Sequence, residues 1–250
     1  MLFLLDHNPV DNVSNEVTMI EKIRTMKPRL IVQLLVVSVI APLLPLILTG
    51  RWDWLEGWAY AIISIFGFVL SRLLLTWRSP KLMAERGRNF DHNDTKSWDK
   101  MLAPIVATGG ALVPLVAGLD ARFGWSGEFS GTMHVIGAVL IVLGYVIGTY
   151  ARLENQFFSP VVRIQTDRSH SVVSTGPYAW VRHPGYSGIL LRYLAAPLLL
   201  DAAWAWVPAI LLTIAFVIRT RLEDSTLQAE LPGYAEYALE TRYRLLPGIW

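Results

Sequence analysis

Polar residues able to do chemistry collect in two stretches of the chain, residues 151–186 and 219–248. In the second stretch, Arg219 and Glu223 are four positions apart and therefore share one face of a helix. On a protein surface such a pair would add only a few tenths of a kcal/mol of stability. Arg219, however, directly follows a long apolar run, where poor hydration makes opposite charges strong ligands. One charge could hold a substrate carboxylate, and the other an ammonium or ribose hydroxyl group.

The first stretch ends in a loop rich in proline and glycine, Gly-Pro-Tyr-Ala-Trp-Val-Arg-His-Pro-Gly-Tyr-Ser-Gly at residues 176–188. Pro177 and Pro184 disfavour helix at the residue before each and lack an N–H donor. We expect a rigid, irregular loop that ends where a helix begins near Tyr186. The free N–H groups of that helix could bind an anion such as a carboxylate. The alternative interpretation is that Arg-His-Pro forms only a turn at a membrane surface.

Six apolar segments must position these two stretches. The first four are long enough to cross roughly 30 Å of hydrocarbon at about 1.5 Å per residue. The fifth is shorter and contains Arg192 and Pro197, and only Asp201 and Ala202 separate its end from the sixth. We therefore predict an all-α polytopic membrane protein with about six transmembrane helices, the last two forming a short helical hairpin. The segments are Leu30–Leu48, Gly57–Thr76, Leu102–Leu119, His134–Tyr150, Tyr186–Leu200 and Ala203–Ile218.

Lysine and arginine alternate between the connections of these segments. From the N-terminus, the connections and tails hold 4, 1, 6, 1, 4, 0 and 4 basic residues. The positive-inside rule then places both termini in the cytoplasm. We expect an integral membrane protein of a bacterial or archaeal inner membrane, or of the endoplasmic reticulum, with a site that faces the cytoplasm. Three regions are predicted: a cytoplasmic lead-in at 1–29, helices 1–4 at 30–150 with a basic loop at 77–101, and a catalytic region at 151–250.

Two arginines lie inside the predicted spans. Arg72 is about one turn from the cytoplasmic end, so its side chain can reach the interface. Arg192 is deeper, where an ionisable residue is by default a candidate for binding substrate. Pairing with a carboxylate of the C-terminal tail, or with a lipid phosphate, is the structural alternative for Arg192.

The composition excludes several classes of protein. Hydrophobic residues make up 53% of the chain and charged residues 17%, whereas soluble domains carry about a quarter charged residues. There is no cysteine, which excludes disulfides and a thiol nucleophile. No phosphate-binding glycine loop, serine-hydrolase motif or zinc-protease motif occurs, and the five histidines are too scattered to indicate a metal site. We expect no metal and no nucleic acid partner.

Two motifs together resemble the isoprenylcysteine carboxyl methyltransferase family, which is related to the integral-membrane phospholipid methyltransferases. They are Gly-Pro-Tyr-x-x-Val-Arg-His-Pro-x-Tyr-x-Gly at 176–188 and Arg-x-x-x-Glu-Asp-x-x-Leu at 219–227. The resemblance extends over about residues 78–250. It implies S-adenosyl-L-methionine as cofactor and a lipophilic acceptor that enters from the bilayer among membrane lipids. That acceptor would be the carboxylate of an isoprenylcysteine, or alternatively the amine of a phospholipid.

The resemblance also implies roles for single residues. Arg219 and Glu223 would be catalytic, with Arg219 also orienting the acceptor; Arg192 remains a candidate for binding substrate only because of its depth in the span. A carboxylate acceptor needs no general base, whereas an amine would need one, for which Glu223 or His183 could serve. The cofactor pocket would comprise Gln165, His170, Ser171, Val172, Val173, Tyr178, His183, Pro184, Gly185, Tyr186 and Glu223.

Two other classes of function stay open from the sequence. Sterol-reductase-like membrane proteins that use NADPH have a similar C-terminal architecture, and a non-enzymatic scaffold or transporter is the third hypothesis. The oligomeric state is not indicated by any pattern.

Overall fold

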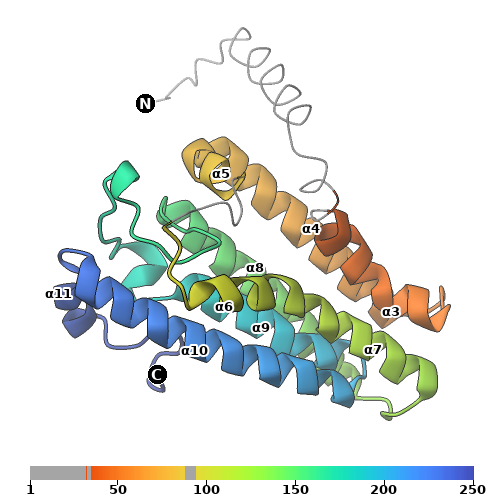
Figure 1. The fold of residues 1–250 in the computed structure, drawn as a ribbon. Helices are drawn as coiled ribbons and strands as arrows, with labels where there is room; N and C mark the ends of the chain where they lie inside the picture. Colours follow the sequence, from red (N-terminus) through yellow and green to blue (C-terminus); the bar gives the residue numbers. More distant parts are fainter. Residues whose placement is uncertain (1–31, 33–34, 88–93) are drawn as a thin grey trace, which may run out of the picture.

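The computed structural model describes residue 32 and residues 35–87 and 94–250 (Figure 1). The predicted lead-in at 1–29 and the first residues of the first apolar segment lie outside this part. Every regular element among the described residues is helical, which confirms the all-α class. The α-helices are α3 (Ala41–Thr49), α4 (Leu55–Arg78), α5 (Pro80–Gly87), α6 (Asp99–Thr108), α7 (Leu112–Phe123), α8 (Gly131–Glu154), α9 (Pro184–Leu199), α10 (Trp206–Glu230) and α11 (Tyr234–Glu240).

Short helical turns of other types join or extend these helices. A π-helical turn η1 (Val36–Ile40) leads into α3, and η2 (Gly109–Ala111) joins α6 to α7. In the connection between α8 and α9 lie two 3-10 turns, η3 (Thr166–Arg168) and η4 (Gly176–Ala179). A last turn, η5 (Ala203–Ala205), precedes α10.

In the part of the chain that the structure describes, four helical segments are long and apolar enough to cross a membrane, judged by length and composition. They are Leu55–Arg78, Asp99–Phe123, Gly131–Glu154 and Ala203–Glu230. The segment Val36–Thr49 is apolar but shorter, and α9 has 16 residues. Each of the six predicted segments is thus helical where described, and four have the length of a span. Six complete spans and the cytoplasmic side of both termini stay predictions.

Local sequence explains where several helices begin and end. Pro184 occupies the first turn of α9, where its missing N–H costs nothing because that donor has no partner inside a helix. Ser130 precedes α8 and its hydroxyl accepts a hydrogen bond from the backbone N–H of Met133. Gly50 and Gly124 end α3 and α7 in the left-handed conformation, with φ of 67° and 65°.

Helices α8 and α9 pack with their backbones almost in contact. A Cβ atom added to Gly188 would lie 2.6 Å from the carbonyl oxygen of Gly144 and 2.7 Å from the backbone nitrogen of Gly148. Small residues at a helix interface permit this close approach. Because α9 begins at the Arg-His-Pro loop, the close packing fixes the position of that loop against α8.

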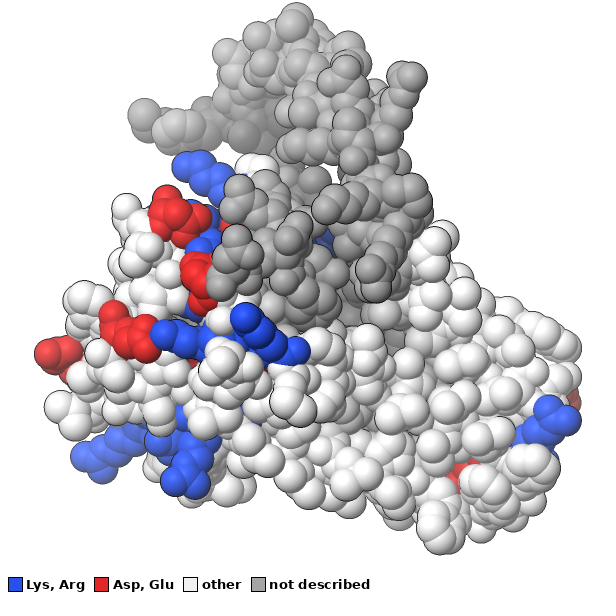
Figure 2. Space-filling view, viewed as in Figure 1, with Lys and Arg blue, Asp and Glu red and all other residues white. Residues whose placement is uncertain are grey.

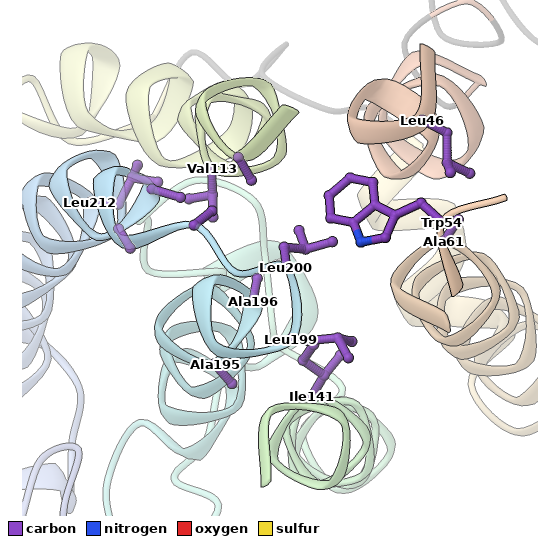
Figure 3. Close-up of a cluster of buried hydrophobic side chains, with 14 residues drawn as sticks. Leu46, Trp54, Ala61, Val113, Ile141, Ala195, Ala196, Leu199, Leu200 and Leu212 are labelled. Atoms are coloured by element: carbon purple, nitrogen blue, oxygen red, sulfur yellow. The ribbon is translucent and has the colours of Figure 1, made fainter. Parts of the chain in front are cut away.

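The main hydrophobic core lies toward the other end of α9 (Figure 3). Leu199 and Leu200 pack there against residues of α3, α4, α7, α8 and α10, among them Leu46, Val113 and Ile141. The turn that follows α9 is tight, and Asp201 adopts a positive φ of 53°. The carboxylate of Asp201 accepts hydrogen bonds from the backbone N–H of Phe129 and from the ring of His134, both at 2.7 Å. The predicted hairpin of the fifth and sixth segments is therefore present.

The two ends of the helical bundle differ in charge. Figure 1 places α5 and α11 at one end, and the ends of α3 and α7 at the other. In Figure 2 most visible charged side chains gather at the end that carries α11, and a broad uncharged surface separates them from a few charges at the far end. Exposed apolar side chains on α4, α8 and α10, such as Phe66, Val135 and Leu211, belong to the described surface. This distribution is typical of an integral membrane protein.

Candidate active site

A cleft opens at the end of the bundle that carries α11, where the two predicted polar stretches meet. The space between its walls, including the part that is open to solvent, is about 710 Å³. Its walls come from the α8–α9 connection, from the start of α9, from the last turns of α10, and from α11. The lining residues are Asn155, Phe157, Phe158, Ser159, Val161, Val162, Arg163, Gln165, His170, Ser171, Val172, Val173, Tyr178, Arg182, His183, Tyr186, Glu223, Leu227, Leu231, Tyr234 and Tyr237.

Most residues expected in a cofactor pocket do line this cleft. Pro184 and Gly185 do not: both are buried in the first turn of α9. A Cβ atom on Gly185 would lie 2.4 Å from the ring of Phe158, so this glycine supports a ring that forms the cleft wall. Those that line the cleft are Gln165, His170, Ser171, Val172, Val173, Tyr178, His183, Tyr186 and Glu223.

The hydroxyl group of Tyr186 joins the two halves of the site. It donates a hydrogen bond to the Glu223 carboxylate at 2.7 Å and accepts one from the Nη1 of Arg219 at 2.8 Å. Tyr186 begins α9, whereas the two charged residues lie four positions apart on α10. The structure therefore confirms that Tyr186 and Arg219 are neighbours, which the short hairpin predicted.

Arg219 stands behind the cleft wall rather than in it. Its side chain is buried, and Asp99, which is fully buried, accepts its Nε at 2.7 Å and its Nη2 at 3.0 Å. The Nη2 also donates to the carbonyl oxygen of Pro160. A guanidinium has five N–H donors, and Tyr186 is the acceptor of one Nη1 hydrogen of Arg219, which leaves the second Nη1 hydrogen without an acceptor among the described residues. Sequence reasoning missed Asp99, because the residue lies in the basic loop, 120 positions away.

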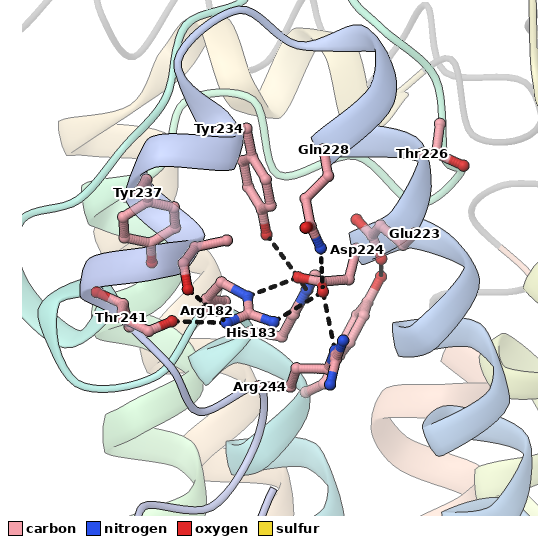
Figure 4. A network of polar contacts seen from close by, with 12 residues as sticks. Arg182, His183, Glu223, Asp224, Thr226, Gln228, Tyr234, Tyr237, Thr241 and Arg244 are labelled. Carbon is pink, nitrogen blue, oxygen red and sulfur yellow. Dashed lines mark hydrogen bonds and ion pairs between the residues drawn. The ribbon is translucent and has the colours of Figure 1, made fainter.

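A second buried carboxylate, Asp224, organises the other side of the site (Figure 4). Arg182 binds it through two N–H groups, at 2.7 and 2.8 Å. Arg244 donates at 2.8 Å, Gln228 at 2.9 Å and Tyr234 at 3.1 Å, while the Nε2 of His183 lies 3.4 Å away. Asp224 is fully buried. It therefore ties the Arg-His-Pro loop, α10, α11 and the C-terminal residues together.

The same loop also holds the C-terminal residues through the backbone. The amide of Arg182 donates to the carbonyl oxygen of Tyr243, and that of His183 to Arg244, each at 2.9 Å. The Arg182 guanidinium donates further to the carbonyl oxygens of Thr241 and Arg242. Burial alone would lower the pKa of Arg182, but the Asp224 carboxylate raises it above its usual value. This arginine is hence a permanent positive charge next to the cleft.

The α8–α9 connection is braced from within. The side-chain amide of Gln165 donates to the carbonyl oxygen of Phe157 at 2.6 Å and accepts from Arg168 at 2.6 Å. The ring of His170 packs on Phe157, with the ring centres 4.5 Å apart. Burial, with the positive charges of Arg163 and Arg168, lowers the pKa of His170 to about 4. His170 is thus neutral at physiological pH and presents an uncharged ring to the cleft.

Arg192 does not reach the cleft. Its guanidinium lies over the ring of Tyr145, 4.2 Å from the ring centre, between α8 and α9. No described carboxylate lies within 4.0 Å of it, so the predicted pairing with a tail carboxylate is absent from the described part. Its predicted role in binding substrate stays a prediction.

Several lining residues were not among those expected in the cofactor pocket. Phe157, Tyr234 and Tyr237 contribute aromatic surface, and Tyr237 also donates a hydrogen bond to the carbonyl oxygen of Tyr178. Asp224 could have been found, since it lies next to Glu223 on the same helix and its partner Arg182 lies inside the first motif. Their pairing depends on the hairpin bringing residues 42 positions apart together.

Fold and site together define a helical membrane protein with a polar, aromatic cleft built on the ends of its last two long helices. Residues 137–229 match the model of the isoprenylcysteine carboxyl methyltransferase family. The match covers most of α8, all of α9, the loop between them and nearly all of α10, which carry most of the cleft lining, whereas α11 lies outside it.

Three curated proteins are similar to parts of the chain. A protein-S-isoprenylcysteine O-methyltransferase of Saccharomyces cerevisiae is 36% identical over 67 residues, 26% of this chain and 28% of that protein. A probable protein-S-isoprenylcysteine O-methyltransferase of Oryza sativa subsp. indica is 37% identical over 57 residues, 22% of this chain and 30% of that protein. The Xenopus laevis protein-S-isoprenylcysteine O-methyltransferase is 35% identical over 57 residues, 22% of this chain and 20% of that protein. The matches span less than a third of each relative's length.

Proposed function

We propose that this protein is a membrane-embedded methyltransferase that uses S-adenosyl-L-methionine and methylates a lipophilic acceptor, namely the C-terminal carboxylate of an isoprenylcysteine. One observation carries the proposal: a single tyrosine hydroxyl holds Glu223 in the cleft wall and bonds Arg219 behind it. The family match and the names of the three relatives support the type of reaction and the acceptor.

The donor set of the cleft fits the proposed cofactor. Glu223 supplies a carboxylate for an ammonium or ribose hydroxyl group, and the rings of Phe157, Tyr178 and His170 supply flat surfaces for an adenine. A neutral His170 suits a cationic sulfonium ligand, because it adds no repulsive charge. When bound, the cofactor would supply an electrophilic methyl group.

The chain's own residues would then position the reactants and exclude water. Methyl transfer to an ionised carboxylate is an in-line displacement that needs no general base, so orientation and electrostatics dominate. Tyr186 fixes the Glu223 carboxylate, and Asp99 with Tyr186 fixes the Arg219 guanidinium. We propose that the remaining Nη1 hydrogen of Arg219 helps to orient the acceptor carboxylate, as the resemblance implied.

We also propose that the cleft faces the cytoplasm. The described parts of the basic connection at 77–101, the connection at 151–185 and the C-terminal tail lie at its end of the bundle, which the positive-inside rule assigns to that side. The acceptor would approach from the bilayer, where the apolar faces of the helices are exposed.

Incubation of the detergent-solubilised protein with radiolabelled S-adenosylmethionine tests the function. Prenylated peptides and total membrane lipids are offered in parallel, and the labelled product is identified. The proposal expects a base-labile methyl ester on the prenylated peptide, which is lost in Glu223→Ala. Label in the amine of a phospholipid instead would show that the acceptor is an amine and not the carboxylate of an isoprenylcysteine. No labelled product from either mixture would contradict methyl transfer, and stabilisation by NADPH alone would favour a reductase.

A further inference from the structure

Four arginines outside the cleft have no counter-charge among the described residues. They are Arg72 of α4, Arg86 of α5, Arg152 of α8 and Arg192 of α9. No described carboxylate lies within 4.0 Å of any of them. Four other arginines differ, because each binds at least one carboxylate: Arg163, Arg182, Arg219 and Arg244.

Local contacts bring these four side chains into one region. The Nε of Arg152 donates to the carbonyl oxygen of Gly148 at 2.7 Å, so this side chain folds back along α8. A Cβ on Gly144, one turn further along α8, would lie 2.5 Å from the Cγ of Arg192. The two arginines thus follow each other along the α8–α9 interface.

The other two arginines complete the group from the side of α4 and α5. Arg86 donates to the carbonyl oxygen of Phe158 at 3.3 Å and lies over that ring. The positive charges of Arg86, Arg192 and Arg72 all act on Arg152. Burial, with the charges of Arg72 and Arg219, lowers the pKa of Arg86 to about 10. Geometry links Arg86 to Arg152 as well: Phe158 lies against Gly185, and a Cβ placed on Gly148 would lie 3.9 Å from the carbonyl oxygen of Gly185 and 3.6 Å from the Nη2 of Arg152.

Four uncompensated positive charges are costly where water is scarce. Like charges repel, and a buried charge without a partner is strongly unfavourable. The Nε of Arg192 illustrates the deficit, since it is buried and has no hydrogen-bond partner. All four residues nevertheless keep partial exposure. The arrangement suits an anion with several oxygens.

Guanidinium groups bind phosphate oxygens in a forked geometry and are over-represented at phosphate sites. The position of the cluster then indicates the source of the phosphate. Arg72 lies six residues before the end of α4 and Arg152 two residues before the end of α8, both at the ends of candidate spans. Headgroup phosphates of a bilayer lie near the ends of such spans, and exposed apolar side chains such as Leu70 and Val146 continue the same helices toward its interior.

We infer that Arg72, Arg86, Arg152 and Arg192 form a binding site for the phosphate group of a membrane lipid, lateral to the cleft. This inference does not depend on methyl transfer. It gives Arg192 the lipid-phosphate partner that the sequence left open, and it gives Arg72 a role beyond reaching the interface.

Thermal unfolding of the purified full chain in a neutral detergent tests the site with three probes. They are a short-chain phosphatidic acid, a fatty carboxylate of the same chain length, and inorganic phosphate. We expect phosphatidic acid to raise the Tm of the wild type, and its Kd to rise about tenfold or more in Arg152→Gln and in Arg72→Gln. Arg78→Gln is the matched control, because Arg78 is exposed at the end of the same helix as Arg72, and it should bind like the wild type.

The variants without added lipid provide a second readout. Removing one of several like charges should leave the Tm unchanged or raise it, whereas a purely structural arginine would lower it. A lower Tm of Arg152→Gln and Arg72→Gln, together with unchanged affinity for phosphatidic acid, would overturn the inference. Equal stabilisation by the fatty carboxylate would overturn the preference for phosphate, and equal stabilisation by inorganic phosphate would overturn the lipid as its source. Arg152→Lys, which keeps the charge but loses the fork, should retain part of the affinity.

Discussion

Replacement of Asp224 by asparagine should destabilise the fold strongly, although this residue does not line the cleft. Its carboxylate is fully buried and accepts five side-chain hydrogen bonds of 3.1 Å or less, three of them from arginines. Asparagine keeps the volume and one acceptor oxygen but removes the charge. Arg182 and Arg244 would then face each other's positive charge without compensation.

The size of the effect follows from these contacts. Each hydrogen bond to a charged group contributes about 1.5–3 kcal/mol, yet the losses do not add, because Arg182 keeps the carbonyl oxygens of Thr241 and Arg242 as acceptors. Breaking a buried ion pair by removing one partner costs about 3–5 kcal/mol. We therefore expect Asp224→Asn to lower the free energy of unfolding by about 3–5 kcal/mol.

The neighbouring residue provides the control. Glu223 is half-buried, and in Glu223→Gln the side-chain oxygen can still accept from Tyr186. That change should lower the unfolding free energy by less than about 1 kcal/mol. Unfolding in mixed micelles, followed by tryptophan fluorescence and checked for reversibility, compares the two variants with the wild type. A free energy of unfolding of Asp224→Asn within about 1 kcal/mol of the wild-type value would refute this reasoning. A Glu223→Gln variant that lowers that free energy as much as Asp224→Asn does would refute it as well.

Three further predictions follow from single contacts. Gly188→Ala should destabilise the protein by about 1–3 kcal/mol, because the new Cβ meets backbone atoms of α8 that cannot move aside. Gly127→Ala is the control, since a Cβ there has no atom within 4 Å. An equal loss of stability in both variants would contradict the packing argument. Tyr186→Phe should raise the Kd for S-adenosylmethionine about tenfold, since Glu223 loses the hydroxyl that holds it. An unchanged Kd in calorimetry would show that the Tyr186 hydroxyl does not position Glu223 for the cofactor. His170 should titrate near pH 4 by NMR, assigned with His170→Gln. Because His170 in the unfolded chain takes up its proton at about pH 6.5, this residue reduces the stability of the fold as the pH falls from about 6.5 to about 4. A titration midpoint of His170 near pH 6.5 in the folded protein would contradict its burial.

Much of the helical architecture could be predicted from the sequence because apolar length is a local property. The segments predicted at 57–76 and 134–150 lie inside α4 and α8. The hairpin was predicted from the few residues between the fifth and sixth segments, and it correctly placed Tyr186 beside Arg219. Whether the shorter segments cross the membrane is not a local property, since it depends on the surrounding helices and lipids.

The partners inside the site could be predicted only in part. Motifs indicated which residues gather at the cleft, but the Asp99–Arg219 pair joins the basic loop to α10 and no spacing rule connects them. Asp224 was overlooked beside Glu223 because helical spacing does not distinguish the carboxylate that faces the cleft from the one that faces α11. Pro184 and Gly185 belong to the motif for a different reason: they begin α9 and support Phe158.

Calorimetric titration of the detergent-solubilised protein with S-adenosylmethionine and its demethylated product tests the central claim most directly. The proposed role of the cleft predicts saturable binding of both compounds by the wild type, lost in Glu223→Ala, while Arg78→Gln, an exposed position that does not line the cleft, binds normally. Absence of binding by the wild type, or equal binding by Glu223→Ala, would contradict a cofactor site built on Glu223 and Tyr186.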